Sequence, residues 1–497
     1  HIESTEDALA ELKKQRVKTL TAAISVSFLG VALMGLLLYL VHIIVAIPED
    51  PPMVAYATQE GDNPDIDTPE VTQTTQRPSS SSTAAQVKVI AAVATADVAV
   101  VNPDIEVDVP SEELSMGIDI GDGFGTGTGD GDGGGIPGIL SKRCDLNDRM
   151  KRIAENGGTP QCEEAVVKSL RWLKKQQNGN GSWGEGQFRA SMTGISLLAY
   201  LAHCETPLSE EFGENVLKGI SFLVDLGMKN PVISEQPALK EICYDHAVAT
   251  YALCEAYTFC KQMDIPSIAN LEKVVIKAVD KILDNQNVDG GWAYNYNTKA
   301  GAHTDLSVTG WNVQALKAAE HGGIKPTKGD IRSTLRKASS YVRKNVMPDG
   351  KFAYKENGNM PRSSLVGVGV LSLQMTGNGS DSAARKGLDW IKNNVKTLQW
   401  GQGSGTENVK SNLYMHYYCV QAAMNRGGDV WTSYNKAFRD AVLSGQNADG
   451  SFRKNDVGYV SGMTGKSENI YRQCLATLML ETYYRFLPGT GEGTKNS

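Results

Sequence analysis

The stretch KSLRWLKKQQNGNGSWG, residues 168–184, changes character halfway along its length. Its first half has the apolar spacing of an amphipathic helix, and its second half is rich in Gln, Asn and Gly and ends near Trp183. Glycine permits the positive φ that ends a helix and turns the chain. Gln177 can bond to free backbone groups at the helix end, and the indole of Trp183 can cover the turn. We predict that both residues are structural staples between layers of helices.

The same pattern recurs along the chain. Residues 277–292 read KAVDKILDNQNVDGGW, and residues 337–352 read KASSYVRKNVMPDGKF, with Val346 in place of the glutamine. Further copies, some of them degenerate, begin at Lys218, Lys386 and Gln446. Each copy ends one helix and turns the chain into the next, so the pattern indicates an internal repeat with a period of about fifty residues.

Two kinds of predicted helix alternate after residue 141. Charged amphipathic helices are expected at residues 162–177, 214–226, 271–285, 331–345, 382–394 and 431–443. Helices made almost wholly of apolar and small residues are expected at 191–203, 244–260, 305–320, 363–375, 412–424 and 469–486. A helix that is apolar on all sides must be buried, whereas a striped helix lies outside. The sequence therefore predicts an all-α domain over residues 141–488, an α6/α6 toroid with an inner and an outer ring.

A long apolar segment precedes this domain. Residues 19–47 are almost wholly apolar, and at about 1.5 Å per residue a helix of that length exceeds the roughly 30 Å hydrocarbon core of a bilayer. Basic residues in the tail, residues 1–18, place it in the cytoplasm by the positive-inside rule. A cleaved signal peptide is the alternative, although its apolar region is normally about 7–15 residues long. We expect a single-pass anchor and an extracytoplasmic C-terminal domain, periplasmic in a bacterium.

The segment between anchor and toroid has the composition of a flexible linker. Residues 48–140 are rich in Gly, Asp and Ser, and Arg77 and Lys88 are their only basic residues. Such a segment cannot bury enough apolar surface to offset its ordering entropy. The tail, residues 489–497, is expected to be disordered. With a net charge of −7 and a pI near 5.7, the chain has no electrostatic footprint for nucleic acid.

The repeat resembles the QW motif of squalene and oxidosqualene cyclases. The motif positions are matched by Lys168, Trp172, Leu173, Gln177, Gly181 and Trp183, and again by Lys277, Ala278, Ile282, Gln286, Gly290 and Trp292. The chain thus resembles the α/α-toroid superfamily of terpene cyclases and protein prenyltransferase β subunits. The Asp-x-Asp-Asp acid of the cyclases is absent from residues 141–488, so the resemblance implies the architecture and not cyclisation.

A possible zinc site follows from the prenyltransferase resemblance. Those β subunits hold zinc with Asp-x-Cys at the start of one inner helix and a His about sixty residues later. Glu241, Cys243 and His303 occupy similar places here, with Glu in place of Asp. Carboxylate, thiolate and imidazole are zinc ligands that leave a fourth position open. The alternative is that His303 is a structural histidine.

The inner helices of a toroid are parallel, so their N-termini gather at one mouth. We expect an apolar central cavity there with polar groups at its rim, the usual form of a ligand site, and helix N-termini that favour an anionic head group. Expected ligand-binding residues are Arg189, Tyr244, His246, His303, Trp311, Arg362, Tyr414, His416 and Tyr471. Asp245 with His246, and His303 with Asp305, could be catalytic acid–base pairs. Alternatively, Asp245 and Asp305 are helix caps.

The chain has eight cysteines. Outside the cytoplasm some could pair, and Cys144–Cys162 is the expected disulfide because both residues flank the first predicted helix. The remaining cysteines lie mainly on the apolar helices, where a thiol acts as a small buried hydrophobe.

Three functions fit these patterns. The first is a membrane-anchored toroid that binds an isoprenoid, another lipid-like molecule or a peptide in its central cavity. The second is a prenyltransferase- or terpene cyclase-type enzyme, with or without zinc. The third is a TonB-like component that couples to a protein partner in the envelope, suggested by the basic tail, the single span and the long linker.

Overall fold

The computed structural model describes residues 143–238, 240–263, 265–299, 302–355, 361–394, 412–454 and 465–485. The predicted span at residues 19–47 and the predicted linker at residues 48–140 lie outside these ranges. Among the helices within them, none combines the length and the apolar character needed to cross a bilayer.

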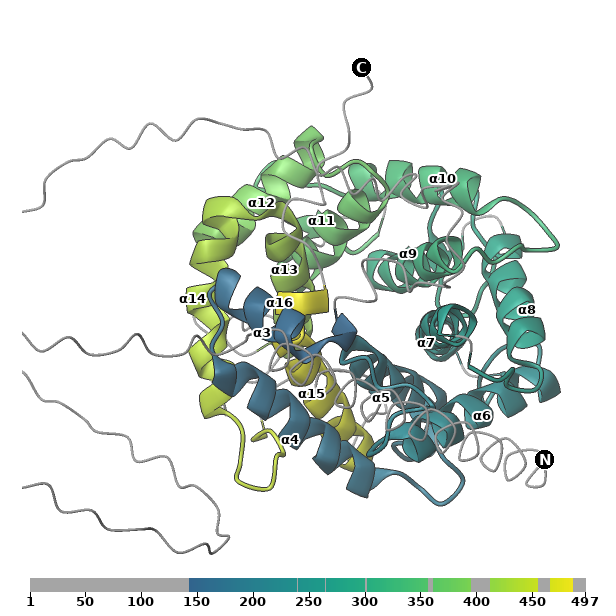
Figure 1. Ribbon diagram of the computed structural model, residues 1–497. Coiled ribbons are helices and arrows are strands. Elements are labelled where there is room, and N and C mark those ends of the chain that lie inside the picture. The colour runs from purple at the N-terminus through teal and green to yellow at the C-terminus, as the bar shows by residue number, and fades with distance from the viewer. Residues whose placement is uncertain are drawn as a thin grey trace, which may run out of the picture. The chain divides into compact units, whose positions relative to one another are not determined.

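Six of the described helices form an inner ring. In chain order they are α5 (Arg189–Ala202), α7 (Ile242–Gln262), α9 (Leu306–His321), α11 (Val366–Met375), α13 (Leu413–Arg426) and α15 (Gly465–Leu480). Each packs against the next, and α15 packs against α5, so the ring is closed (Figure 1). Nearly all their residues are buried, because these helices have neighbours on every side.

The amphipathic helices form the outer ring around them. They are α4 (Pro160–Gln176), α6 (Gly213–Lys229), α8 (Leu271–Asp284), α10 (Ile331–Lys344), α12 (Ser382–Asn394) and α14 (Gly428–Ser444). Helix α14 packs against α4, which joins the last repeat to the first. The predicted α6/α6 toroid is therefore confirmed in the described part of the chain, with each predicted helix present to within a few residues at its ends.

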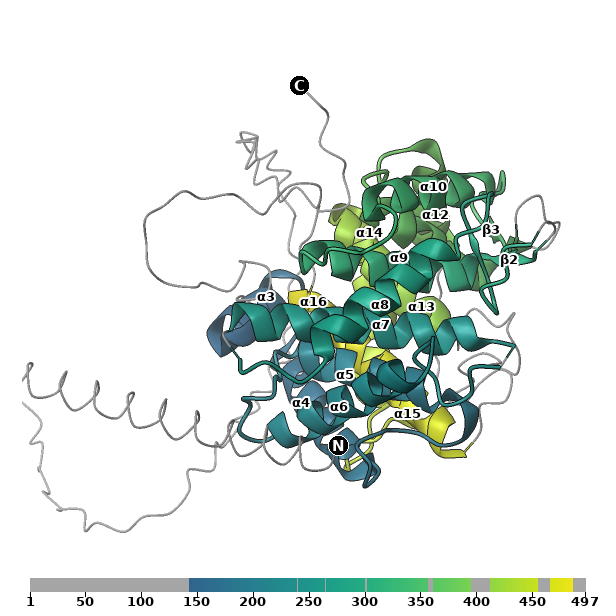
Figure 2. The same ribbon diagram turned by 90° about the vertical axis from the view of Figure 1, so that its right-hand side faces the viewer.

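The two ends of the toroid differ. Short helices α3 (Leu146–Glu155) and α16 (Thr482–Arg485) lie at the end where the inner helices finish, and the strands lie at the opposite end (Figure 2). There β1 (Trp292–Ala293) pairs antiparallel with β2 (Thr304–Asp305), and β3 (Phe352–Ala353) pairs with β4 (Pro361–Arg362). Two 3₁₀ turns, η1 (Gly186–Phe188) and η2 (Ser363–Leu365), lead into α5 and α11. The last predicted helix is divided, because α15 ends at Leu480 and α16 starts after Glu481.

The glutamines of the repeat connect neighbouring outer helices. Gln177 Nε2 donates to Gly181 O in its own turn and to Asn215 O in α6, both at 2.9 Å. Gln286 does the same with Gly290 and Thr334, and Gln446 with Gly450 and Ala165. Since Ala165 belongs to α4, the last of these glutamines helps to close the ring. The glutamines are staples, but the prediction that Gln177 joins two layers of helices is wrong, because these bonds connect neighbouring helices of the outer ring.

The tryptophans connect the two rings. The Trp183 side chain is 0% exposed, and its Nε1 donates to Leu173 O of α4 at 2.7 Å. Its backbone N–H donates to the hydroxyl of Thr193 on α5, so the residue joins an outer helix to the following inner helix. Trp292 repeats both contacts with Ile282 and Thr309. The predicted role of Trp183 is confirmed.

In four of the repeats the turn glycine contacts the next outer helix. Gly450 has a φ of +90°, and a Cβ built on it would clash with the carbonyl oxygen of Lys168 in α4. The same clash recurs for Gly181 with Lys218, Gly290 with Lys337, and Gly350 with Lys386. Only glycine meets both demands, positive φ and close backbone approach.

The disulfide joins Cys144 to Cys204, so the predicted pair Cys144–Cys162 is wrong. Cys204 follows the end of α5, with its Cα 5.0 Å from that of Cys144, within disulfide range. Cys162 instead lies buried in the first turn of α4, where its thiol takes part in capping at Thr159. The five remaining cysteines are also buried thiols, as predicted for those on the inner helices.

Candidate functional site

Four tyrosines meet at the strand end of the toroid, and we call Tyr244, Tyr294, Tyr354 and Tyr414 the phenol cluster. Tyr244 and Tyr414 lie in the first turns of α7 and α13, while Tyr294 and Tyr354 directly follow β1 and β3. The turns are fixed to the inner helices, because Tyr294 O accepts from Cys243 N at 2.9 Å and Tyr354 O accepts from Leu306 N at 3.1 Å. All four side chains are partly exposed at this mouth.

The phenol cluster converges on one buried carboxylate. Tyr294 Oη donates to Asp305 Oδ2 at 3.1 Å and also contacts Tyr354 Oη. Tyr244 Oη lies 2.6 Å from Ser307 Oγ, which donates to Asp305 Oδ1. The Tyr414 hydroxyl has no hydrogen-bond partner among the described residues. The cluster therefore holds a connected hydrogen-bond network around Asp305, with the Tyr414 hydroxyl oxygen buried beside it.

The phenols stay protonated at neutral pH. Burial, together with the charge of Asp305, raises the pKa of Tyr244, Tyr294 and Tyr354 above the ordinary value. Burial also raises the pKa of Tyr414. A protonated phenol both donates and accepts hydrogen bonds and presents an aromatic face, which suits recognition more than proton abstraction.

Several predicted site residues do lie at this mouth. The His303 side chain is exposed, with its ring centroid 5.5 Å from that of Tyr354 and 6.4 Å from that of Tyr294. Arg189 opens α5 and pairs with Glu235 at 3.2 Å. Arg362 lies in β4, whereas Tyr471 is a buried residue of α15.

Two of the three predicted mouth histidines lie elsewhere. His246 is buried, accepts from Ile233 N at 3.0 Å through Nδ1, and donates from Nε2 to Ala278 O of α8 at 3.1 Å. Burial lowers its pKa to about 4, so it is neutral. His416 is buried against Tyr434 of α14, with 2.8 Å between Nδ1 and Oη. Each histidine follows a mouth tyrosine by two positions, about 200° around a helix, and therefore faces the outer ring.

Neither of the predicted acid–base pairs is joined by a hydrogen bond. Asp245 is buried and caps the neighbouring helix α5, accepting from Ser191 N at 2.9 Å and from Ser234 Oγ at 2.7 Å. Burial raises its pKa to about 6 against these hydrogen bonds. Asp305 caps α9 by accepting from Val308 N at 3.0 Å. Since neither aspartate bonds to its supposed histidine partner, the capping alternative holds for both.

The predicted zinc ligands are not brought together. Cys243 is fully buried, receives a hydrogen bond from Asn312 Nδ2 at 3.4 Å, and has a pKa raised to about 12 by burial. Glu241 and His303 lie nearer the surface. Among the described residues, no three His, Cys, Asp or Glu side chains form a group that could hold a metal ion. The resemblance in sequence spacing did not extend to spatial proximity.

Aromatic side chains fill the inside of the ring where a cavity was expected. The Trp311 ring stacks on Tyr417 at 5.9 Å and meets Tyr418 edge-on at 5.6 Å. These three side chains are 3%, 0% and 1% exposed. A cavity wide enough for a lipid chain would leave its wall accessible, so the part of the interior that these three side chains occupy is packed and Trp311 is a core residue.

The helix N-termini at the mouth are also occupied by the protein's own acceptors. Oxygens of Asp245, Tyr294, Asp305 and Asn412 accept from first-turn N–H groups of α5, α7, α9 and α13. An anionic head group would have to displace them, so the expected anion preference is not supported at these four helices.

The opposite end carries a buried charge network that sequence reasoning missed. His203 lies between two carboxylates, with Nδ1 2.8 Å from Glu205 and Nε2 3.0 Å from Glu163, which also pairs with Arg149. Both ring nitrogens can donate only when the imidazole is protonated. Burial opposes that charge, but the hydrogen bonds to Glu163 and Glu205 outweigh it and raise the pKa of His203 to about 9.

We expect this network to make stability depend on pH. Because the folded pKa of His203 exceeds its unfolded value, its contribution is fully present below about pH 6.5 and is lost as the pH rises to about 9. The loss should be on the order of 2 to 3 kcal/mol in unfolding free energy, measured by urea titration at pH 6 and pH 9. In His203→Gln the unfolding free energy should fall less between pH 6 and pH 9, because the contribution of His203 is absent. An identical decline in the variant would contradict the assignment.

The comparisons with known proteins do not assign this chain to a family. Neither protein-family models nor curated proteins give a match to this chain. Among solved structures, the α-1,6-mannanase GH76A of Salegentibacter sp. HEL1_6 is similar with a TM-score of 0.48 and 12% identity, covering 65% of this chain and 98% of its own. A variant of the type II terpene cyclase MstE from Scytonema gives 0.41 and 12%, covering 68% and 99%. At TM-scores below 0.5, the assignment of a toroid rests on the chain's own helix contacts.

Proposed function

We propose that this chain is a ligand-binding module whose ligand is contacted by the phenol cluster. The observation that carries the proposal is that four partly exposed tyrosines from separate elements meet at one mouth, three of them linked by hydrogen bonds to Asp305. The acid–base pairs and the metal group that an enzyme of the prenyl-transfer class would need are not formed by the residues expected to form them. The burial of Trp311, Tyr417 and Tyr418 supports a ligand site at the mouth over one inside the ring.

A peptide is the ligand class that fits this mouth best. Protonated phenols can pair with both the N–H and C=O groups of a peptide, and their rings offer rigid apolar contact area. Tyrosine is enriched in protein-recognition surfaces for these reasons. The exposed ring of His303 extends the same surface beside Tyr354.

The proposal includes the setting of the domain. Residues 19–47 would anchor the chain in a membrane, and residues 48–140 would hold the toroid outside the cytoplasm. The Cys144–Cys204 disulfide supports that location, because disulfides persist in oxidising compartments.

Site-specific photo-crosslinking tests the site. The full chain is expressed in its own membrane with p-benzoylphenylalanine in place of Tyr354, or of Tyr257 as a matched control. The Tyr257 hydroxyl also bonds a carboxylate, Glu272 at 2.9 Å, but near the other end of α7. Mass spectrometry should find peptide adducts at position 354 and not at position 257.

A second substitution links the adducts to hydrogen bonding. Tyr294→Phe should weaken binding by about three- to tenfold, as expected from one lost hydrogen bond of about 1 kcal/mol, and should lower the adduct yield at low ligand concentration. Tyr257→Phe should leave that yield unchanged. Equal adducts at positions 354 and 257, or adducts indifferent to Tyr294→Phe, would contradict a mouth site.

A further inference from the structure

Helix α10 presents a basic face on the outer wall of the toroid (Figure 1). The helix has five basic and no acidic residues, whereas each of the other five outer helices has at least one acidic residue. We call its exposed residues the α10 face, namely Arg332, Arg336, Lys337, Ser340, Arg343 and Lys344. The face therefore consists of long cationic side chains and one serine.

The basic residues of the α10 face form two rows. At about 100° per residue, its three arginines lie within about 40° of one another on the helix surface. Its two lysines lie roughly 100° further round, with Ser340 between the rows. A helix of this length rises about 21 Å, so the five charges are spread along the wall and not gathered at one point.

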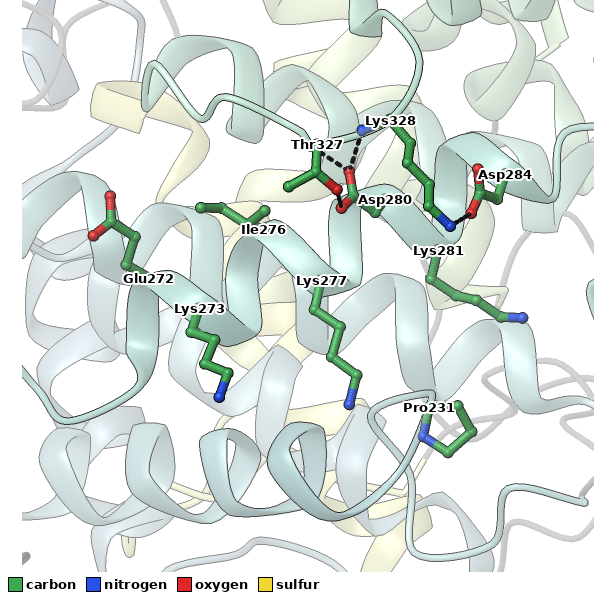
Figure 3. Close-up of a pocket in the computed structure, with 10 residues that line it drawn as sticks. All are labelled: Pro231, Glu272, Lys273, Ile276, Lys277, Asp280, Lys281, Asp284, Thr327 and Lys328. Atoms are coloured by element: carbon green, nitrogen blue, oxygen red, sulfur yellow. Dashed lines mark hydrogen bonds and ion pairs between the residues drawn. The ribbon is translucent and has the colours of Figure 1, made fainter.

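The surroundings of the α10 face do not balance its charge. Residues 325–355 contain nine basic and two acidic residues, a net charge of +7. Carboxylates of neighbouring elements form the ion pairs Glu320–Arg332, Asp381–Arg343 and Asp284–Lys328, and Asp280 accepts from the N–H group of Lys328 (Figure 3). Subtracting all four of these carboxylates still leaves this stretch with a net charge of +3.

The excess charge is greatest at the centre of the face. Arg336 and Lys337 have no ion-pair partner among the described residues. The neighbouring outer helix α8 is different, because its three acidic and three basic residues balance one another, as Glu272, Lys273, Lys277, Asp280, Lys281 and Asp284 (Figure 3). The positive charge is therefore a local property of α10 and not of every outer helix.

The α10 face has no apolar or aromatic anchor. The exposed large hydrophobic residues of the described chain are Leu146 and Val288, and neither belongs to α10. Stable protein interfaces depend on aromatic and aliphatic anchors at their centre. Single-stranded nucleic acids are held by aromatic side chains among the basic ones. A face with charge alone suits the head groups of anionic phospholipids, which attract basic side chains without an apolar contact.

We propose that the α10 face binds membrane surfaces that contain anionic phospholipids. The outer helices of a ring form a convex wall, and a flat surface touches such a wall along one helix. Long arginine and lysine side chains can reach the phosphate groups of several lipids from that line. The proposal concerns a second site, separate from the phenol cluster, and it depends neither on the ligand nor on the anchor proposed above.

Lysine footprinting on the purified full chain tests the proposal. Acetylation rates of Lys337 and Lys344 are measured by mass spectrometry, with the exposed Lys436 of α14 as internal reference. Vesicles of phosphatidylcholine alone are compared with vesicles that contain roughly one third phosphatidylglycerol. A span at residues 19–47 would enter both kinds of vesicle, so the comparison isolates head-group charge. The two lysines should be protected about threefold by the anionic vesicles only, and 1 M salt, where the screening length is about 3 Å, should remove the protection.

Matched variants assign the protection to α10. An anionic surface attracts each nearby basic residue by about fivefold in affinity, so Arg336→Gln with Lys337→Gln should weaken vesicle binding by roughly ten- to thirtyfold and expose Lys344. Lys168→Gln with Lys175→Gln removes the same charge from exposed positions of α4 and should leave Lys344 protected. Equal protection by both kinds of vesicle, or equal effects of the two double variants, would overturn the proposal.

Soluble polyanions test the alternative partners. Polyglutamate and a DNA duplex are added at the same concentration of negative charge as the anionic vesicles. Each should protect Lys344 less than the vesicles do. Stronger protection by polyglutamate would assign the α10 face to an acidic protein, and stronger protection by DNA would assign it to a nucleic acid. Either result would overturn the membrane proposal.

Discussion

Gly450→Ala should lower the free energy of unfolding by about 2 to 5 kcal/mol, because alanine at positive φ is strained and its Cβ would force the backbone away from Lys168. The site is the junction of the last repeat with the first. If the ring were open there, the Cβ would point into solvent and most of this cost would be absent. Urea unfolding of the full chain measures the change.

Gly186→Ala is the matched control for this prediction. Gly186 also has a positive φ, +67°, but a Cβ built on it meets nothing within 4 Å. Gly186→Ala should therefore lower the free energy of unfolding only by the backbone strain, about 1 to 2 kcal/mol. A loss at Gly450→Ala no larger than at Gly186→Ala would show that Gly450 does not touch Lys168.

Trp183→Ala should lower the free energy of unfolding by about 3 to 5 kcal/mol, the usual range for removing a fully buried tryptophan. The substitution empties the space beside Tyr200, whose ring centroid lies 5.7 Å away, and leaves Leu173 O without its indole donor. Thermal unfolding should show a clearly lower midpoint. Adduct yield at position 354, per folded molecule, should be unchanged because Trp183 is not part of the phenol cluster.

Trp172→Ala provides the control on the same outer helix. Trp172 is only partly buried, so its removal should cost much less than that of Trp183. An unchanged midpoint for Trp183→Ala would contradict its role as a staple. A large loss of adducts in the folded fraction would instead connect Trp183 to the mouth.

The fold was predictable because its signal is repeated. The alternation of striped and wholly apolar helices, with Gln177, Gln286 and Gln446 in the same place of each cycle, indicates two rings in contact. The structure adds what the glutamines bond to, including the contact of Gln446 with Ala165 that helps to close the ring. The short helix α3 and the break at Glu481 were missed, since neither belongs to the repeat.

The site was predictable only in part, because sequence position locates a residue along a helix more easily than around it. Tyr244 and Tyr414 were expected at the mouth and lie there, whereas His246 and His416, two positions later, face the outer ring. Counting about 100° per residue from each tyrosine would have revealed this difference.

The missed part of the phenol cluster lies in turns. Tyr294 and Tyr354 both follow an aromatic residue and an alanine, in WAY and FAY, and this recurrence was available in the sequence. Their meeting at Asp305 depends on how the turns cap the inner helices, which no local pattern reveals. The Cys144–Cys204 pairing likewise depends on the three-dimensional path of the chain.

Ring closure is tested most directly by a zero-length carbodiimide crosslink between the first and last repeats. Asp449 precedes Gly450, whose close approach to Lys168 O places this turn of the last repeat beside α4, the helix that carries Lys175. The ion pair Lys328–Asp284, 3.1 Å apart in neighbouring repeats, serves as an internal reference. A closed toroid predicts an Asp449–Lys175 link within one chain alongside the reference link. An open solenoid would give the reference link alone, and that result would contradict the closed ring and the single mouth that depends on it.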